Sequence, residues 1–245
     1  MNTAALPRPS FDLPRAARSL RALLRNPDDL PQVFALIESL SSAGHFHRLR
    51  SGFQETEAGR RLLRTKPDIV TILADRERIR AMPEGSLGRA YLAFVESENI
   101  SAQGIRDASE AAGRRDPGDE EIAFIRARMR DTHDLWHAAT GYRGDVLGEV
   151  GLLAFIVAQQ WNTAIALIVL AALVKGIGRS EIVTIVRDGY RRGRRAAWLP
   201  SQDWESLLGE PLDVVRARLG LGAPPVYTPV RTADLRAQGI VGAPA

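Results

Sequence analysis

Apolar residues recur along most of the chain at intervals of three and four positions, the spacing of a helix that buries one face. In residues 30–40, for example, Val33, Ile37 and Leu40 follow this spacing. No segment shows the alternation of apolar and polar residues that marks a half-buried strand. We therefore predict an all-α fold, a compact multi-helix bundle, with helices over residues 14–24, 30–40, 56–65, 68–82, 86–95, 120–139, 180–194 and 204–219.

Polar and proline-rich stretches divide the predicted helices. Residues 41–51 and 99–119 are polar, and the second stretch is also rich in Gly and Ser, so both are predicted to be connections. Residues 1–14 contain several prolines and are predicted to form an irregular arm. Residues 222–245 are rich in Ala and Pro and are predicted to form an extended tail. A single helical domain is expected over residues 15–221.

Residues 150–174 contain no charged side chain and resemble a membrane span at first sight. Polar residues at 159–163 interrupt this stretch and leave apolar pieces of nine and eleven residues. A spanning helix needs about 18–20 apolar residues, so neither piece is long enough. A buried hairpin or one long central helix is therefore favoured. So much aliphatic surface can also wall a cavity for an apolar ligand.

The composition of the chain restricts the chemistry it can carry. The 245 residues include no cysteine, which excludes disulfides, thiolate metal ligands and cysteine nucleophiles. The 33 basic and 29 acidic residues leave a formal net charge of +4, which does not indicate nucleic-acid binding. Lysine occurs only at Lys66 and Lys175. The abundant arginine favours phosphate or carboxylate groups, including those of lipids.

Two segments concentrate arginine. Residues 15–26 are basic and partly amphipathic, which fits the first helix of the domain, a transit-like sequence or a membrane-surface element. The first of these interpretations is favoured. The helix predicted over residues 180–194 has a solvated polar face as its favoured interpretation, and a patch for an anionic membrane or protein partner as the alternative. Its arginines are Arg187, Arg191, Arg192, Arg194 and Arg195.

The most distinctive chemistry lies near the middle of the chain. His133 and His137 are one helical turn apart, so both imidazoles leave the same face of a helix. A glycine-containing turn ends this helix, and Asp145 is placed to cap the next one. Two helices joined by a short turn fold back on each other, which can bring Glu149 toward the histidines. Together with the neighbouring Asp134, these residues predict a metal site.

The donor set favours Zn²⁺, and Fe, Mn or Mg also fits two imidazoles with carboxylates. The motif lacks the glutamate of H-E-x-x-H, which disfavours a metallohydrolase. A site with an open coordination position would act as a Lewis acid, whereas four protein ligands would make the metal structural, and the residues alone leave both open. The other two histidines, His45 and His47, are interpreted as surface residues in a connection.

The central motif resembles that of a known family. His133, Asp134 and His137 form an HDxxH pattern, and Glu149 follows after eleven residues. This spacing is similar to the signature of the Coq-four family of ubiquinone (coenzyme Q) biosynthesis proteins. The surrounding sequence HDLWHAATGYRGDVLGEVGLLAF also resembles that family, as do MPEGSLGRAYLAFV upstream and RRGRRAAWLPSQDWESLLGEPLDVVRARLGL downstream. The resemblance covers residues 66–221.

The resemblance implies an all-α, metal-dependent lyase. The expected reaction removes the C1 carboxylate from a polyprenylated 4-hydroxybenzoate, with or without oxidation and hydroxylation at that carbon. A metal would stabilise charge that develops as carbon dioxide leaves. Arg126 and Arg130 are candidates to pair with the substrate carboxylate. The resemblance implies a zinc-type catalytic site at His133, Asp134, His137 and Glu149.

The resemblance also implies an apolar cavity for the polyprenyl chain. Leu152, Leu153 and Ile156 follow the carboxylate ligand on the same helix face and are candidate lipid contacts. Expected partners are the polyprenylated hydroxybenzoate or another quinone precursor, the membrane surface and other quinone-biosynthesis enzymes. No nucleic acid is expected, and a homodimer is left open.

The same resemblance leaves the location and the role open. In a bacterium the protein would be cytoplasmic and peripheral on the inner membrane, and in a eukaryote it would lie at the mitochondrial inner membrane. The alternative to a lyase is a non-catalytic scaffold that binds polyprenyl lipids and organises the other enzymes. In that case the metal would be structural.

Overall fold

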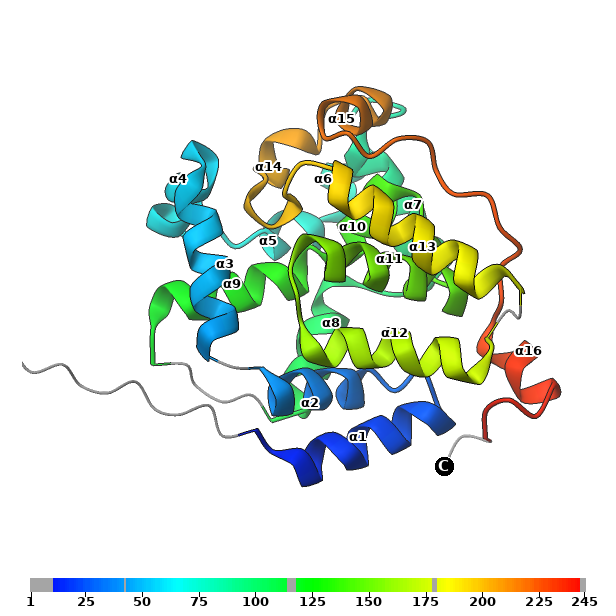
Figure 1. The fold of residues 1–245 in the computed structure, drawn as a ribbon. Helices are drawn as coiled ribbons and strands as arrows, with labels where there is room; N and C mark the ends of the chain where they lie inside the picture. The colour runs from blue at the N-terminus through cyan, green and yellow to red at the C-terminus, as the bar shows by residue number, and fades with distance from the viewer. Residues whose placement is uncertain (1–10, 42, 114–117, 178–179, 243–245) are drawn as a thin grey trace, which may run out of the picture.

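Helices form nearly all of the regular structure in the computed structural model, which describes residues 11–41, 43–113, 118–177 and 180–242 (Figure 1). These residues include sixteen α-helices, one short 3-10 helix and no strand, which confirms the all-α prediction. In chain order the elements are α1 (Leu13–Arg25), α2 (Leu30–Leu40), α3 (Ala43–Glu55), α4 (Glu57–Thr65), α5 (Val70–Leu73), α6 (Arg76–Arg80), α7 (Leu87–Ser97), α8 (Ala102–Ala111), α9 (Glu120–Asp131), α10 (His133–Thr140), α11 (Val146–Gln159), α12 (Thr163–Lys175), α13 (Ser180–Arg195), the 3-10 helix η1 (Leu199–Ser201), α14 (Trp204–Leu207), α15 (Leu212–Arg218) and α16 (Thr232–Ala237).

Helices α11 and α13 pack against each other along much of their length (Figure 1). Their close approach depends on two glycines of α13, four residues apart. A Cβ atom at Gly189 would lie 2.3 Å from the backbone oxygen of Gly151, and one at Gly193 would lie 2.4 Å from that of Phe155. Neither position has room for a side chain, so these glycines set the spacing of the two helices.

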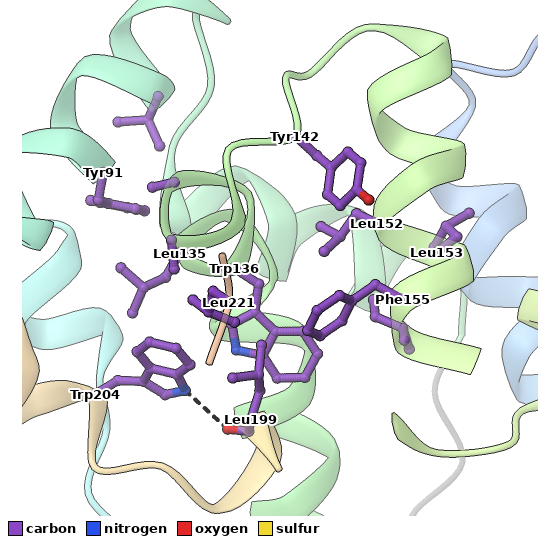
Figure 2. Close-up of a cluster of buried hydrophobic side chains, with 14 of the residues drawn as sticks. Tyr91, Leu135, Trp136, Tyr142, Leu152, Leu153, Phe155, Leu199, Trp204 and Leu221 are labelled. Carbon is purple, nitrogen blue, oxygen red and sulfur yellow. Dashed lines mark hydrogen bonds between the residues drawn. The ribbon is translucent and has the colours of Figure 1, made fainter. Parts of the chain in front are cut away.

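The largest apolar cluster fills the space around α7, α10, α11 and α13. Trp136 and Trp204 are fully buried in it, and Trp204 Nε1 donates a hydrogen bond to the carbonyl oxygen of Leu199 at 3.2 Å (Figure 2). Figure 2 also shows that Leu152 and Leu153, both members of this cluster, leave α11 in different directions. Because Leu135, Trp136 and Ala139 of α10 belong to it, this cluster supports the helix that carries both histidines of the predicted metal site.

A second layer, formed by α1, α2 and α12, lies below α11 in Figure 1. Helix α1 packs on α2, and α2 contacts both α8 and α12. This layer has its own small cluster of buried residues, Ala16, Leu23, Leu36 and Ala164. Helices α3 and α4 add a third cluster against α9. The core is therefore divided into several clusters, although α12 of the second layer also contributes Ile165, Val169 and Ala172 to the largest one.

Two predicted connections contain helices instead. Helix α3 begins within the predicted polar connection and continues beyond it to Glu55, and α8 lies within the predicted long loop. In α3, His45, Leu49 and Phe53 recur every four residues and are buried, but the polar residues between them hide this stripe. The buried positions of α8 are Ala102 and Ser109, which carry little apolar signal. Both predictions of irregular structure were wrong for this reason.

Several long predicted helices are interrupted. The one over residues 68–82 is divided into α5 and α6, the one over 120–139 into α9 and α10 at Thr132, and the one over 204–219 into α14 and α15. Residues 150–174 form the α11–α12 hairpin, one of the two predicted alternatives. No helix among the described residues is both long enough and apolar enough to cross a membrane.

The two ends of the chain contain more helix than predicted. Helix α1 begins at Leu13, within the predicted arm, while residues 1–10 of that arm lie outside the described residues, as do 42, 114–117, 178–179 and 243–245. The predicted extended tail is mainly irregular over 222–242 but includes α16. There, Arg236 Nη2 donates a hydrogen bond to Asn26 Oδ1 at 3.0 Å, which ties this segment to the second layer.

Candidate metal centre

The turn between α10 and α11 is held by contacts that aim Glu149 at α10. Gly141 ends α10 with a φ of 83°, a left-handed conformation that favours glycine. Asp145 then caps α11 and also accepts hydrogen bonds from Tyr227 Oη at 2.9 Å and from the backbone N–H of Val230 at 3.0 Å. The predicted helix–turn–helix and its cap are confirmed, and the buried Asp145 carboxylate anchors the turn to the C-terminal segment.

His133, His137 and Glu149 converge on one point. Glu149 Oε2 lies 2.9 Å from His137 Nε2, and Glu149 Oε1 lies 3.4 Å from His133 Nε2. One ligand atom from each of the three residues lies within 4.8 Å of the others. Two imidazole nitrogens and a carboxylate oxygen at this spacing are a donor set that suits a first-row divalent metal ion.

The outer side of each histidine ring is also engaged. His137 Nδ1 lies 3.0 Å from the carbonyl oxygen of Tyr142. A carbonyl can only accept, so Nδ1 carries a hydrogen, and Nε2 would be the nitrogen that binds a metal. Phe94 stacks on the His137 ring with centroids 4.9 Å apart and planes 12° from parallel. These contacts fix the ring in the orientation that a metal ligand requires.

Asp134 lies beside the three converging ligands rather than among them. Its Oδ1 is 3.5 Å from His133 Nδ1, on the side of the ring that faces away from Glu149. In this position the carboxylate orients His133, as carboxylates commonly do for metal-binding histidines. The expectation that Asp134 is itself a ligand stays a prediction.

The charged groups of the centre strongly influence one another. Burial lowers the pKa of His133, but the Glu149 carboxylate, together with Asp134, outweighs burial and raises that pKa to about 10. Burial raises the pKa of Glu149, and the two histidines more than offset it, so the pKa falls well below its ordinary value. A divalent cation would occupy the same atoms as these protons, so metal binding and protonation compete.

A cavity of about 1140 Å³ extends from the three ligands into the space between the two layers. Its wall near the ligands includes Phe94, Leu153 and Ile156. Farther away the wall is built mainly from apolar side chains of α1, α2 and α12, including Ile37 and Ile168. A large apolar cavity with a few convergent polar groups is the usual form of a site for a small molecule.

Comparison with known proteins assigns this helical domain to a family. The sequence model described as coenzyme Q (ubiquinone) biosynthesis protein Coq4 matches residues 14–225. The chain belongs to the Coq4 family. This family acts in ubiquinone biosynthesis, which confirms the resemblance predicted from the HDxxH motif and the pathway it implied.

Individual relatives agree with the family assignment. The chain is 32% identical over 213 residues to the ubiquinone biosynthesis protein coq4, mitochondrial, of Talaromyces stipitatus, covering 85% of this chain and 71% of the relative. It is 31% identical over 199 residues to the mitochondrial COQ4 homolog of Bos taurus, covering 79% and 68%. A crystal structure from Nostoc punctiforme, of a protein provisionally named for ubiquinone biosynthesis, shares the fold. The TM-score is 0.65 at 20% identity, covering 87% of this chain and 98% of that one.

The three candidate lipid contacts of this Coq4 chain are placed differently. Leu153 and Ile156 line the cavity, but Leu152 does not and is fully buried in the main cluster. Successive residues of an α-helix are rotated by about 100°, so Leu152 and Leu153 leave α11 in clearly different directions. Because Val150, Leu153 and Ile156 share the cavity side, the expectation that Leu152 lies on that side was wrong.

The two candidate arginines of α9 both reach the cavity wall. Arg126 forms an ion pair with Glu38 and lies over the Phe46 ring at 5.1 Å from its centroid. Arg130 instead donates from Nε to Asp131 Oδ1 at 2.7 Å. Both arginines therefore line the cavity that contains the three converging ligands, and their partners differ. Pairing of either one with a substrate carboxylate stays a prediction.

His45 is a cavity residue that the sequence interpretation missed. It is buried on α3 and lines the cavity, so its assignment to the surface was wrong. Burial, together with the nearby Arg48 charge, lowers the pKa of His45 to about 4. A hydrogen bond with the Trp161 backbone acts in the opposite direction and raises this pKa by a smaller amount. His47 is partly buried and its Nδ1 lies 3.1 Å from Arg50 Nη2. The i, i+4 pattern of His45 with Leu49 was the available signal.

Proposed function

We propose that this Coq4 protein catalyses metal-dependent decarboxylation at C1 of a polyprenylated 4-hydroxybenzoate. The observation that supports this proposal best is the position of His133, His137 and Glu149 at the wall of a large apolar cavity. A polyprenylated aromatic acid has both parts that such a site would accommodate. Its long apolar chain matches the cavity, and its carboxylate and phenolic oxygens match a polar, metal-binding end.

The donor set fits a divalent metal, with Zn²⁺ proposed first and Fe, Mn or Mg as alternatives. The three converging residues would hold the ion, with Asp134 as a fourth ligand or as the group that orients His133. When bound, the metal would supply Lewis-acid stabilisation of negative charge on a substrate oxygen. The carbonyl of Tyr142 would keep His137 in the ligating tautomer.

The remaining cavity residues would favour loss of carbon dioxide by excluding water. Phe94, Leu153 and Ile156 surround the polar end with apolar surface. A charged carboxylate loses hydration in such surroundings, whereas the departing carbon dioxide is neutral and needs none. In the simple reaction the bond between C1 and the carboxylate breaks, its electron pair stays with the ring, and a proton takes its place at C1.

The test is turnover by the full-length protein loaded with each metal in turn. With 3-farnesyl-4-hydroxybenzoate as substrate, mass spectrometry should detect 2-farnesylphenol, or a hydroquinone if O₂ is consumed and a hydroxyl replaces the carboxylate. Glu149→Ala should lower the rate at least about a hundredfold. Glu84→Ala, at an exposed glutamate, is the matched control. The enzymatic proposal fails if metal-loaded protein leaves the substrate unchanged and Glu149→Ala does not alter cellular quinone levels.

The second candidate function is a lipid-binding scaffold that presents polyprenyl intermediates to other quinone-biosynthesis enzymes. Exposed apolar side chains favour it, since Trp161 is 61%, Leu170 53% and Val174 80% exposed on or beside α12. This scaffold would bind lipid and capture those enzymes without turnover. Removal of the metal separates the two candidates, because a structural ion would hold α10 and α11 together, whereas a catalytic ion could leave without unfolding them.

Either function is compatible with a position at a membrane surface, which we include in the proposal. Helix α12, which carries the exposed apolar residues, contacts α13, and α13 exposes Arg187, Arg191 and Arg194. Apolar side chains beside arginines are the features by which a peripheral protein binds anionic lipids. The location would be the inner membrane of a bacterium or of a mitochondrion.

A further inference from the structure

Arg130 is a buried arginine with unused hydrogen-bond donors. Its side chain is only 9% exposed, and among the described residues its one hydrogen bond runs from Nε to Asp131 Oδ1. Asp131 is itself buried, and its Oδ2 accepts from Arg106 Nη2 at 2.8 Å. The two Nη groups of Arg130 have no acceptor within the described part of the chain. Because Arg130 lines the cavity, these donors are available to a ligand there.

The position of Arg130 places these donors beside the metal centre. Helices α9 and α10 are almost continuous, because Thr132 donates its N–H to the Arg128 carbonyl and its own carbonyl accepts from Trp136, both at 3.0 Å. Along such a helix, Arg130 precedes His133 by three positions, so the two side chains leave the same face about 5–6 Å apart at Cβ. Both residues line the cavity.

Two other arginines of the cavity wall have carboxylate partners. Arg126, one turn before Arg130, is paired with Glu38. Arg231 is paired with Glu98 through Nη1 at 2.6 Å and Nη2 at 3.1 Å. In these two arginines the terminal groups are used to connect helices. In Arg130 the protein instead holds the guanidinium by its Nε edge, which leaves the outer edge available to a ligand.

We propose that Arg130 binds the carboxylate of the cavity's ligand and thereby selects a carboxylated ring over a decarboxylated one. This inference rests on the proposed function, because that function supplies the carboxylate beside the metal centre. A guanidinium presents parallel N–H donors that match the two oxygens of a carboxylate. Asp131 fixes the plane of the guanidinium through Nε. Because the carboxylate leaves as carbon dioxide, the product loses this contact and is bound more weakly than the substrate.

The charges around Arg130 nearly cancel, so an anionic ligand depends more on directed hydrogen bonds than on long-range attraction. Arg106 binds both Asp68 and Asp131, so two arginines and two carboxylates nearly balance in this region. A nearby anion is therefore not strongly attracted from a distance. It gains binding energy only when it reaches the short, directed hydrogen bonds of the Nη groups, which favours a ligand whose carboxylate is held at a defined place by its tail.

The test compares the affinity of the full-length protein for 3-farnesyl-4-hydroxybenzoate and for 2-farnesylphenol, which lacks the carboxylate. Equilibrium dialysis is carried out with zinc-loaded and with metal-free protein, and mass spectrometry of the recovered ligand reports any turnover. Arg130→Met should weaken binding of the acid by about ten- to a hundredfold and change binding of the phenol by less than about threefold. Arg60→Met, at an exposed arginine of α4 that does not line the cavity, should leave the ratio of the two affinities unchanged.

An equal loss of affinity for both ligands in Arg130→Met, or no loss for either, overturns the proposal. If Arg130→Met does not fold, Arg130→Lys decides, because lysine retains the charge but not the planar pair of donors, so the acid should still lose affinity relative to the phenol. The recovered ligand keeps the two proposals separate. If no turnover is found but Arg130→Met changes the ratio of the two affinities, the lyase is rejected and the contact between Arg130 and the carboxylate is retained. If turnover is found but Arg130→Met leaves that ratio unchanged, the lyase is retained and the Arg130 contact is rejected.

Discussion

Helices α11 and α12 are both rich in aliphatic residues, but their surroundings in the structure are very different. The stretch that they share, residues 150–174, contains no charged side chain. Nine residues of α11 are buried, whereas α12 buries only Ala164, Ile165, Val169 and Ala172. Helix α11 is enclosed by α10, α12 and α13. Helix α12 separates the cavity on one side from the protein surface on the other.

This difference shows that an aliphatic residue of an apolar helix can pack in the core, line a cavity or lie on the surface. The hydrophobic pattern of the helix does not distinguish these three positions. Leu152 of α11 is buried in the core, Ile168 of α12 lines the cavity, and Leu170 of α12 is exposed on the surface. Each side chain is aliphatic and each helix is apolar all round. What separates them is the neighbour that each helix face meets, and that neighbour comes from another part of the chain.

Truncating a leucine on each helix should produce the largest contrast. Leu152→Ala removes a fully buried side chain from the main cluster and should lower the free energy of unfolding by about 2–5 kcal/mol. Leu170→Ala removes a half-exposed side chain and should change it by less than about 0.5 kcal/mol. Chemical denaturation of both variants, with Zn²⁺ held constant, measures the difference. Similar losses in the two variants would mean that α12 is packed against something as firmly as α11.

The same distinction explains what could be predicted from the sequence. The helix pair carrying His133, His137 and Glu149 depends on local signals, namely the histidine spacing, the Gly141 turn and the Asp145 cap, and the structure contains it as predicted. The cavity depends on contacts between distant segments, so its wall could not be assigned residue by residue. To decide whether Leu152 or Leu153 faces the cavity, one must know how α11 is rotated about its own axis.

Two further residues show what the sequence does not indicate about the surroundings of a side chain. His45 belongs to a buried helix stripe that is hidden among polar neighbours, so the only sequence signal of its burial was its i, i+4 spacing with Leu49. Arg130 is one of many arginines, and its sequence context is no more distinctive than that of Arg126. Only the partners, Asp131 for one and Glu38 for the other, separate them. Which carboxylate pairs with each arginine is determined by tertiary packing, so a pattern in one sequence does not reveal it.

Acid should destabilise the region where α3 meets the α11–α12 turn. The pKa of His45 is about 4 in the folded protein, below the ordinary value of 6.5, with burial as the main cause. Between these values the unfolded chain binds more protons, so stability is present above pH 6.5 and is lost as pH falls toward 4. The loss amounts to at most about 3 kcal/mol. Unfolding free energies measured from pH 7.5 to 4 should fall more steeply for wild type than for His45→Gln.

The comparison of slopes is needed because carboxylates also titrate in this range. At pH 7.5 both proteins are compared with His45 neutral, so their difference there reports packing alone. The additional difference that develops on acidification reports the histidine. Parallel curves for the two proteins would show that His45 is not protected from protonation in the folded state.

Filling the cavity from α12 should weaken ligand binding without harming the core. Ile168 lines the cavity, and Ile168→Trp would occupy part of its volume. We expect about a tenfold loss of affinity for 2-farnesylphenol, since contacts with part of the apolar chain are lost. Leu170→Trp places the same side chain on the exposed side of α12 and should leave this affinity unchanged. Equal affinities in both variants would place the ligand outside the cavity.

The smallest expected effect concerns the exposed side of α12 and the proposed membrane surface. Val174 is 80% exposed, and Val174→Ser removes apolar area without a change in charge. If this surface enters the lipid interface, binding to vesicles of phosphatidylglycerol and phosphatidylcholine should weaken by about three- to fivefold, the loss expected for one partly inserted valine. Val214→Ser, at an exposed valine of α15, is the matched control and should bind as wild type does. Cosedimentation at low ionic strength measures both. If the two serine variants weaken binding equally, the lipid contact is not specific to α12, and the exposed residues of this helix would then be better explained by a protein partner.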